Sequence, residues 1–233
     1  MKKIILPFLF FFVFISISDV SAQSIINEWE AHTGPTNSVI FSKDGLHLIT
    51  GGDDGTIRIF KVSDNSLQKV IKSKSNSVKK LMLSDDGTKF AALGDKGYIE
   101  IYSYSTGLLL STITDTCRSF CFSSDGGKIY TCDDHLNIWD ISASSLIKSL
   151  TIPISNAVIA TKETSKVLLG GEDSKIYLFD FNGNQTTREY AEHINPVLSL
   201  SLSPDGSRFA SSSADRTIRI WDINSSTSLK MGF

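Results

Sequence analysis

The chain has 233 residues, of which 41% are hydrophobic and 21% are charged, and its formal net charge is -2. This composition supports one sizeable core and differs from that of intrinsically disordered chains. General nucleic-acid binding is disfavoured, because it depends on a basic excess that neutralises phosphates. The three cysteines are too few for a disulfide scaffold.

Residues 1–22 predict a secretory signal peptide. The segment starts with Met-Lys-Lys, continues with an apolar run over residues 4–17 and ends with the small residues Val20 and Ala22. The apolar run is shorter than the roughly 20 residues that a membrane-spanning helix needs. We therefore expect cleavage before Gln23, export to a secreted or periplasmic location, and no stable membrane span after cleavage.

From about residue 25 onward one pattern recurs with a period of about 40 residues. Internal periods of this length are typical of repeat architectures. A turn containing Asp-Gly recurs at Lys43-Asp44-Gly45, Asp85-Asp86-Gly87, Ser124-Asp125-Gly126 and Pro204-Asp205-Gly206. An aromatic residue ends the third predicted strand of each repeat, at Phe60, Tyr102, Trp139, Phe179 and Trp221. The pattern divides residues 23–233 into five units, at approximately 25–64, 65–106, 107–143, 144–183 and 184–233.

Each unit predicts short β-strands and no helix, because apolar and polar residues alternate with period two. Three strands lead up to the aromatic residue, and a weaker fourth follows it, as at 67–71, 108–113 and 146–150. Residues 25–29 and 228–233 are further fourth-strand candidates at the two ends. Four antiparallel strands make a twisted sheet that cannot bury both faces alone. We therefore expect the sheets to stack radially, as in a propeller.

The last unit closely resembles a WD repeat. It contains His193, a Ser-Pro-Asp-Gly turn at 203–206 and Ser-Ala-Asp-Arg-Thr-Ile-Arg-Ile-Trp-Asp over 213–222. The first unit is similar, with His32 and Gly-Asp-Asp-Gly-Thr-Ile-Arg-Ile-Phe over 52–60. The resemblance implies an all-β WD-repeat β-propeller of five four-stranded units. These would form either a closed five-blade ring or an open arc of a longer, seven-blade propeller, and an open arc would favour oligomers.

The resemblance also implies a buried tetrad of histidine, serine or threonine, aspartate and tryptophan that ties the strands of a blade together. The last unit matches all four positions, whereas the first ends in Phe60, which has no indole N–H donor. The three middle units lack the histidine, so we expect their blades to depend more on apolar packing and to be less stable. The implied tetrad residues are His193, Ser211, Asp215, Trp221, His32, Thr50 and Asp54.

No phosphate-binding loop, His-Glu-x-x-His motif or nucleophile elbow occurs in the sequence, so we expect no catalytic residue and no cofactor. By count, Cys117, Cys121, Cys132 and His135 suggest a zinc site. Cys117 and Cys121 would however lie roughly 13 Å apart along one strand, too far to share a zinc ion. We therefore expect no metal.

Free buried thiols are the default expectation for the cysteines, and a Cys117–Cys132 disulfide is the alternative. Pairing Phe122 with Ile129 would place Cys132 opposite Ser119, which makes the cysteine pair diagonal. The sequons at Asn184 and Asn224 matter only if a eukaryotic secretory pathway makes the protein.

The family resemblance places partner binding on one face of the propeller. That face is formed by the loops entering the first strands and by the turns between second and third strands. In the five units it carries four carboxylates, two basic residues and amides, which suit a charged protein or peptide partner. The predicted face consists of Asn37, Asp53, Lys79, Asp95, Arg118, Asp133, Asn156 and Glu172, and the last unit has Leu198 and Ala214 at the same positions.

We therefore predict a non-catalytic protein–protein interaction scaffold of the WD-repeat type, exported from the cytosol. Two alternatives remain open. One is an exported propeller enzyme, such as a lactonase-like hydrolase, that holds a metal with the carboxylate ring. The other is a purely structural component of an envelope or surface.

Overall fold

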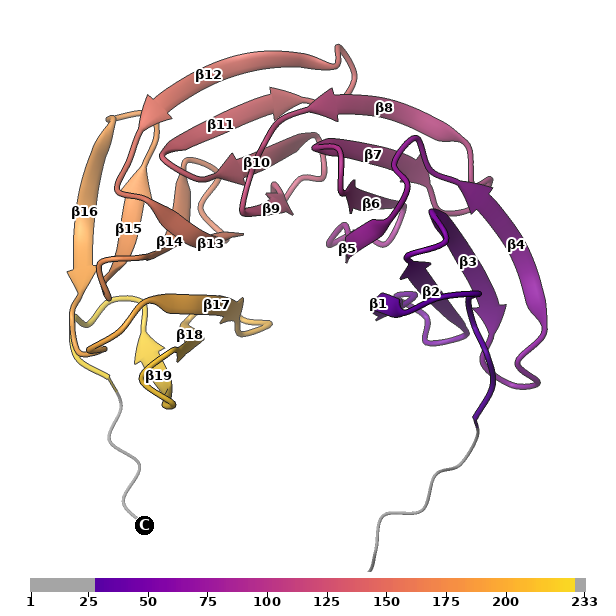
Figure 1. Ribbon diagram of the computed structural model, residues 1–233. Coiled ribbons are helices and arrows are strands. Elements are labelled where there is room, and N and C mark those ends of the chain that lie inside the picture. Colours follow the sequence, from indigo (N-terminus) through magenta and orange to yellow (C-terminus); the bar gives the residue numbers. More distant parts are fainter. Residues whose placement is uncertain (1–27, 229–233) are drawn as a thin grey trace, which may run out of the picture.

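The computed structural model describes residues 28–228, and these contain five antiparallel β-sheets and no helix. Figure 1 shows the sheets arranged radially in an arc that is open between the first sheet and the last. We refer to the sheets as blades one to five in chain order. The predicted all-β fold with propeller-type blades is confirmed, and the arc form rather than the closed ring is the one observed.

Within residues 28–228 the first four blades have four strands each, and the fifth has three. Blade one contains β1 (Thr36–Phe41), β2 (His47–Gly52), β3 (Thr56–Lys61) and β4 (Leu67–Lys72). Blade two contains β5 (Val78–Leu83), β6 (Lys89–Gly94), β7 (Tyr98–Ser103) and β8 (Leu109–Thr114). Blade three contains β9 (Ser119–Phe122), β10 (Lys128–Cys132), β11 (His135–Asp140) and β12 (Ser145–Thr151). Blade four contains β13 (Ser155–Ala160), β14 (Lys166–Gly171), β15 (Ile176–Asp180) and β16 (Gln185–Tyr190), and blade five contains β17 (Val197–Leu202), β18 (Arg208–Ser213) and β19 (Ile218–Asp222).

The blades are shifted by one strand relative to the five sequence units. Strand β4 falls in the unit 65–106, for example, but pairs with β3 of the preceding unit. The predicted fourth strands after the aromatic residues are confirmed as β4, β8 and β12. The candidates at 25–29 and 228–233 lie largely outside the described residues, although Ser228 forms an isolated antiparallel bridge with Trp221. The predicted signal peptide at 1–22 also lies outside them. Within residues 28–228 no helix could cross a membrane.

Adjacent blades pack through apolar side chains that alternate along each strand. In β3, Ile57 and Ile59 belong to the cluster that joins blade one to blade two, which contributes Val78 and Phe90. Similar clusters join each following pair of blades. Burying one such side chain stabilises the fold by about 1.5–3 kcal/mol, so the blade interfaces hold the arc together.

The Asp-Gly turns between first and second strands are closed by local hydrogen bonds. In blade five, Ser203 Oγ donates to Asp205 Oδ1 over 2.6 Å and Ser207 N donates to the same oxygen over 3.0 Å, while Gly206 adopts a φ of 75°. A side chain at position 206 would be strained in this left-handed conformation. The hydrogen bonds from Ser203 and Ser207 lower the pKa of Asp205 to about 2.

Candidate interaction face

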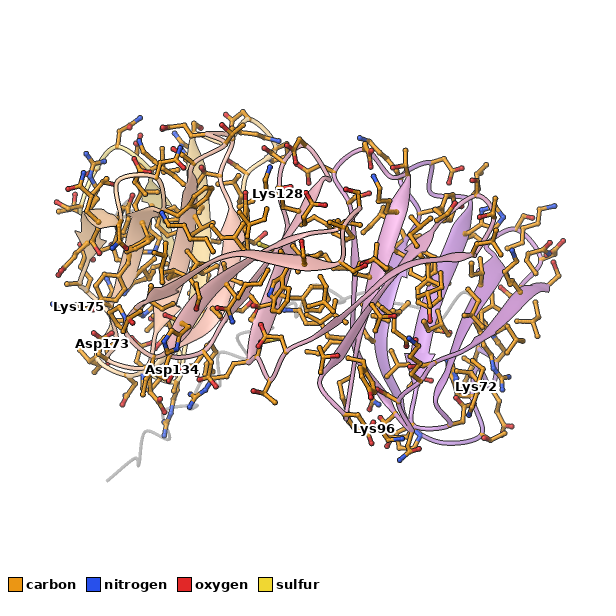
Figure 2. The ribbon with its side chains drawn as sticks, turned by 90° about the horizontal axis from the view of Figure 1, so that it is seen from above. Lys72, Lys96, Lys128, Asp134, Asp173 and Lys175 are labelled. Carbon is orange, nitrogen blue, oxygen red and sulfur yellow. The ribbon has the colours of Figure 1, made fainter. Side chains whose placement is uncertain are left out.

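The turns between second and third strands, β2–β3 and its equivalents, lie on one face of the arc, which we call the turn face. Figure 2 places Asp134 and Asp173, in the β10–β11 and β14–β15 turns, along one edge of the molecule together with Lys96 of the β6–β7 turn. Lys128, which follows the β9–β10 turn, lies at the opposite edge. The β2–β3-type turns and the Asp-Gly turns therefore belong to opposite faces.

Behind the turn face, blade five contains the complete histidine tetrad. His193 Nδ1 lies 2.7 Å from Asp215 Oδ2, and His193 Nε2 lies 2.7 Å from Ser211 Oγ. Trp221 Nε1 donates to Ser211 Oγ over 2.8 Å. Burial would raise the pKa of Asp215, but hydrogen bonds from Thr217 and His193 outweigh it and hold the pKa well below its usual range. The structure thus brings all four side chains together and links the loop before β17 to β18 and β19.

Blade one contains a variant of the same arrangement. His32 Nδ1 lies 2.9 Å from Asp54 Oδ1, and Nε2 lies 2.9 Å from Thr50 Oγ1. Arg58 adds an ion pair to Asp54 Oδ2 at 3.1 Å. Phe60 is buried at the position of the tryptophan. The three predicted polar residues of this blade therefore meet without an indole donor.

Blade two replaces the missing histidine with Glu100, which is only 2% exposed. Its carboxylate accepts hydrogen bonds from Ser73 Oγ and from the backbone N–H of Lys74 at 3.2 Å. Our sequence analysis missed this residue, although an acid between Ile99 and Ile101 on a buried strand was a signal that could have revealed it.

Blade three replaces the histidine with Asp115, which the sequence analysis also missed. Asp115 Oδ2 accepts hydrogen bonds from Thr131 Oγ1, from Asn137 Nδ2 at 3.1 Å and from Trp139 Nε1 at 3.3 Å. Blade four has a smaller link, from the Tyr177 hydroxyl to Asp173. The middle blades therefore have polar contacts of their own, and the expectation that they depend more on apolar packing stays a prediction. Their lower stability stays a prediction.

On the turn face, the first group of predicted residues links blade one to blade two. Asp53 Oδ1 accepts hydrogen bonds from Asn37 Nδ2 at 2.7 Å, from Lys79 Nζ at 3.0 Å and from the Ser77 hydroxyl. Asn37 also donates to the backbone oxygen of Val78 over 3.0 Å. Hydrogen bonds from Ser77, Asn37 and Lys79 lower the pKa of Asp53 to about 2.

The second group is centred on Arg118 and links blade three to blade four. Arg118 Nε lies 2.8 Å from Asp133 Oδ1, while Nη1 lies 3.0 Å from Glu172 Oε2 and 2.8 Å from Asn156 Oδ1. Burial would lower the pKa of Arg118, but Glu172 and Asp133 raise it. One guanidinium thus orients three polar side chains from two blades.

Asp95 lies between the two groups and has a different environment. It accepts hydrogen bonds from the backbone N–H groups of Asn76 at 3.0 Å and Ser77 at 3.4 Å, and it forms no ion pair with a described basic side chain. A hollow of about 370 Å³ lies here, lined by Asp95, Lys79 and Arg118 among others. The eight predicted residues therefore form two fixed polar groups and one carboxylate without a cation.

The three cysteines are free thiols. The predicted register is confirmed, since Ile129 pairs with Phe122 and Cys132 with Ser119. Burial raises the pKa of Cys117 and of Cys121 to about 12. Within the described part of the chain, no group of three or more His, Cys, Asp or Glu side chains could hold a metal ion.

Comparison with known families identifies the repeat. The family described as "WD domain, G-beta repeat" matches residues 23–61 and 184–222, which contain the two histidine-bearing arrangements. The first and last units of the chain therefore match the WD repeat. With the five blades of the structure, these matches confirm the predicted WD-repeat propeller fold.

The proteins to which this chain is similar include serine-threonine kinase receptor-associated protein. The protein of Gallus gallus is 29% identical over 197 residues, which cover 82% of this chain and 56% of the relative. The protein of Homo sapiens is 28% identical over 199 residues, with the same coverage. Autophagy-related protein 16 of Arabidopsis thaliana is 23% identical over 203 residues, which cover 84% of this chain and 40% of that protein. The chain spans about half the length of the first of these relatives.

Proposed function

We propose that the chain is a non-catalytic protein-binding module and that the turn face is its binding surface. The observation that carries this proposal is the Arg118 group, in which one guanidinium holds Asp133, Asn156 and Glu172 in place across two blades. The side chain of Arg118 is still 40% exposed. Polar groups that are exposed but already oriented suit protein recognition, because little side-chain entropy is lost on binding.

The charge of the turn face indicates the chemistry of the partner. Its eight predicted residues include four carboxylates and two basic side chains, and Asp95 has no cationic partner among the described residues. Among these eight residues the acidic groups outnumber the basic ones by two, so a complementary partner presents a basic segment. The name of one relative, serine-threonine kinase receptor-associated protein, is that of a protein associated with another protein, which supports a binding role.

The enzyme alternative has less support. It required the carboxylates of the turn face to hold a metal, but three of the four pair instead with Lys79 or Arg118, and the described residues offer no three-ligand group. No observation favours the purely structural alternative over the binding module. Export is a further part of the proposal and rests on the pattern of residues 1–22 alone. Sequencing the N-terminus of the mature protein tests it, since export predicts a start at Gln23.

The binding proposal is tested by comparing two charge changes on opposite faces. Immobilised wild-type chain, Asp95→Lys and Lys128→Gln are incubated with extract and culture supernatant of the producing cells, and retained proteins are quantified by mass spectrometry. Asp95→Lys reverses the unpaired charge on the turn face, whereas Lys128 lies on the opposite face (Figure 2). We expect proteins enriched by the wild type to be lost with Asp95→Lys and retained with Lys128→Gln. Equal retention by all three forms would refute the assignment of the face.

A further inference from the structure

Blade three has a hollow beside Asp115, the acid that takes the place of the histidine of blades one and five. In those blades the ring bridges a hydroxyl on the second strand and an aspartate in the following turn. Blade three retains the hydroxyl at Thr131, the turn aspartate at Asp134 and the indole at Trp139. It has no histidine in the loop between β8 and β9.

The loop before β9 is also shorter than the loop that carries the histidine of blade five. Four residues, 115–118, connect β8 to β9, whereas six, 191–196, connect β16 to β17 and include His193. The carboxylate of Asp115 meets Thr131, but a carboxylate is smaller than an imidazole. A hollow of about 410 Å³ remains, and we call it the blade-three socket; its lining includes Asp115, Asp133, Asp134, His135, Asn137 and Trp139.

The socket is acidic and has one aromatic residue in its lining. Three of its lining residues are aspartates, and none is lysine or arginine. Asp133 is paired with Arg118, but Asp115 and Asp134 contact only neutral donors and His135. Asp115 Oδ2 accepts all three side-chain hydrogen bonds, and Oδ1 accepts none from the described residues 28–228. An accessible carboxylate oxygen beside an indole ring is therefore available to a ligand.

We infer that the blade-three socket binds the guanidinium group of an arginine side chain from a partner. A guanidinium is flat, so it can lie against the ring of an indole. Its N–H groups can donate to Asp115 and Asp134 together, and its face can stack on the Trp139 indole. Lysine fits this set less well, because its ammonium is a point charge that cannot stack. The inference deepens the proposed function, since it names the group that a basic partner inserts beside the turn face.

The test uses NMR of the purified chain labelled with ¹⁵N and a short probe peptide. The chain has three tryptophans, so their indole N–H signals are few, and Trp139→Phe identifies the signal from the socket. The probe is acetyl-Gly-Arg-Gly-amide. Its control is the same peptide with citrulline, which has nearly the same shape but no charge. We expect the arginine peptide to move the Trp139 signal saturably and the citrulline peptide to leave it unchanged.

Three variants locate the binding. Asp115→Asn and Asp134→Asn should each weaken the arginine peptide about ten-fold, as expected when a charge-assisted hydrogen bond becomes a neutral one. Asp173→Asn, in the corresponding turn of blade four, should bind like wild type. Asp134 is 69% exposed, so its variant remains informative even if Asp115→Asn disturbs the fold.

The inference is overturned if the arginine peptide gives no saturable shift at Trp139, or if the citrulline peptide binds equally well. Equal weakening by Asp173→Asn would also overturn it, because binding would then reflect general negative charge. Failure here differs from failure of the proposed function, which is tested at Asp95 with whole proteins. An empty socket would leave that result unaffected.

Discussion

Replacing Asp215 with alanine should weaken blade five substantially. The Asp215 side chain is 2% exposed and accepts hydrogen bonds from His193 Nδ1 at 2.7 Å and from Thr217 N at 2.9 Å. It also accepts from Thr217 Oγ1 at 2.7 Å and from Ile194 N at 3.3 Å. Alanine removes the acceptor for all four donors.

The four donors do not contribute equally. The donors on Thr217 and Ile194 are near solvent and can bind water in the variant, but the His193 ring is 1% exposed and cannot. One buried donor left without a partner costs about 1–3 kcal/mol, and a lost hydrogen bond to a charged group falls in a similar range. We therefore expect the free energy of unfolding to fall by about 2–4 kcal/mol in Asp215→Ala. At about 2–4 °C per kcal/mol for a chain of this size, the melting temperature should fall by roughly 5–15 °C.

The assay is thermal unfolding together with amide hydrogen exchange, which shows whether protection is lost first in blade five. Asp205→Ala is the matched control. Asp205 also accepts hydrogen bonds from a serine and a backbone N–H, but it lies in an exposed turn, so water can replace it. The reasoning is refuted if Asp215→Ala melts within about 2 °C of wild type, or if Asp205→Ala is equally destabilised.

Three further predictions concern other parts of the molecule. Glu100→Ala should lower the melting temperature more than Arg118→Ala. Glu100 is buried, and its removal leaves the Ser73 hydroxyl and the Lys74 backbone N–H without an acceptor, whereas the ion pairs of Arg118 are exposed to solvent. Equal melting temperatures of the two variants would contradict this. The stabilising contribution of Asp86 should be complete above about pH 5 and decrease progressively towards pH 2, because its folded pKa is lowered from 3.8 to about 2. Acid titration of wild type and Asp86→Asn, followed by circular dichroism, measures this, and identical acid transitions would contradict it. A thiol reagent should modify Cys117 only slowly in native buffer and quickly in urea, since burial raises its pKa to about 12; rapid native labelling would show that the thiol is accessible.

The repeat, the strands and the Asp-Gly turns could be predicted from the sequence because they depend on residues close together in the chain. Alternation of apolar residues in β3 and the Ser203–Asp205 pair are properties of a few consecutive residues. The tetrad of blade five was implied by the resemblance to the WD repeat, and its four residues lie within one repeat. In each case the local chain restricts where the side chains can lie.

Other features depend on which loops and strands lie side by side, and only the tertiary structure decided them. Arg118 and Glu172 are 54 residues apart and meet because blades three and four are neighbours. Glu100 and Asp115 replace histidine from different positions in the repeat, so a pattern search for histidine misses them. The blade-three socket is lined by side chains from the loop before β9, from the β10–β11 turn and from β12, which only the folded blade brings together. Spacing along the chain determines the elements, whereas packing between blades determines which charges pair and which space remains open.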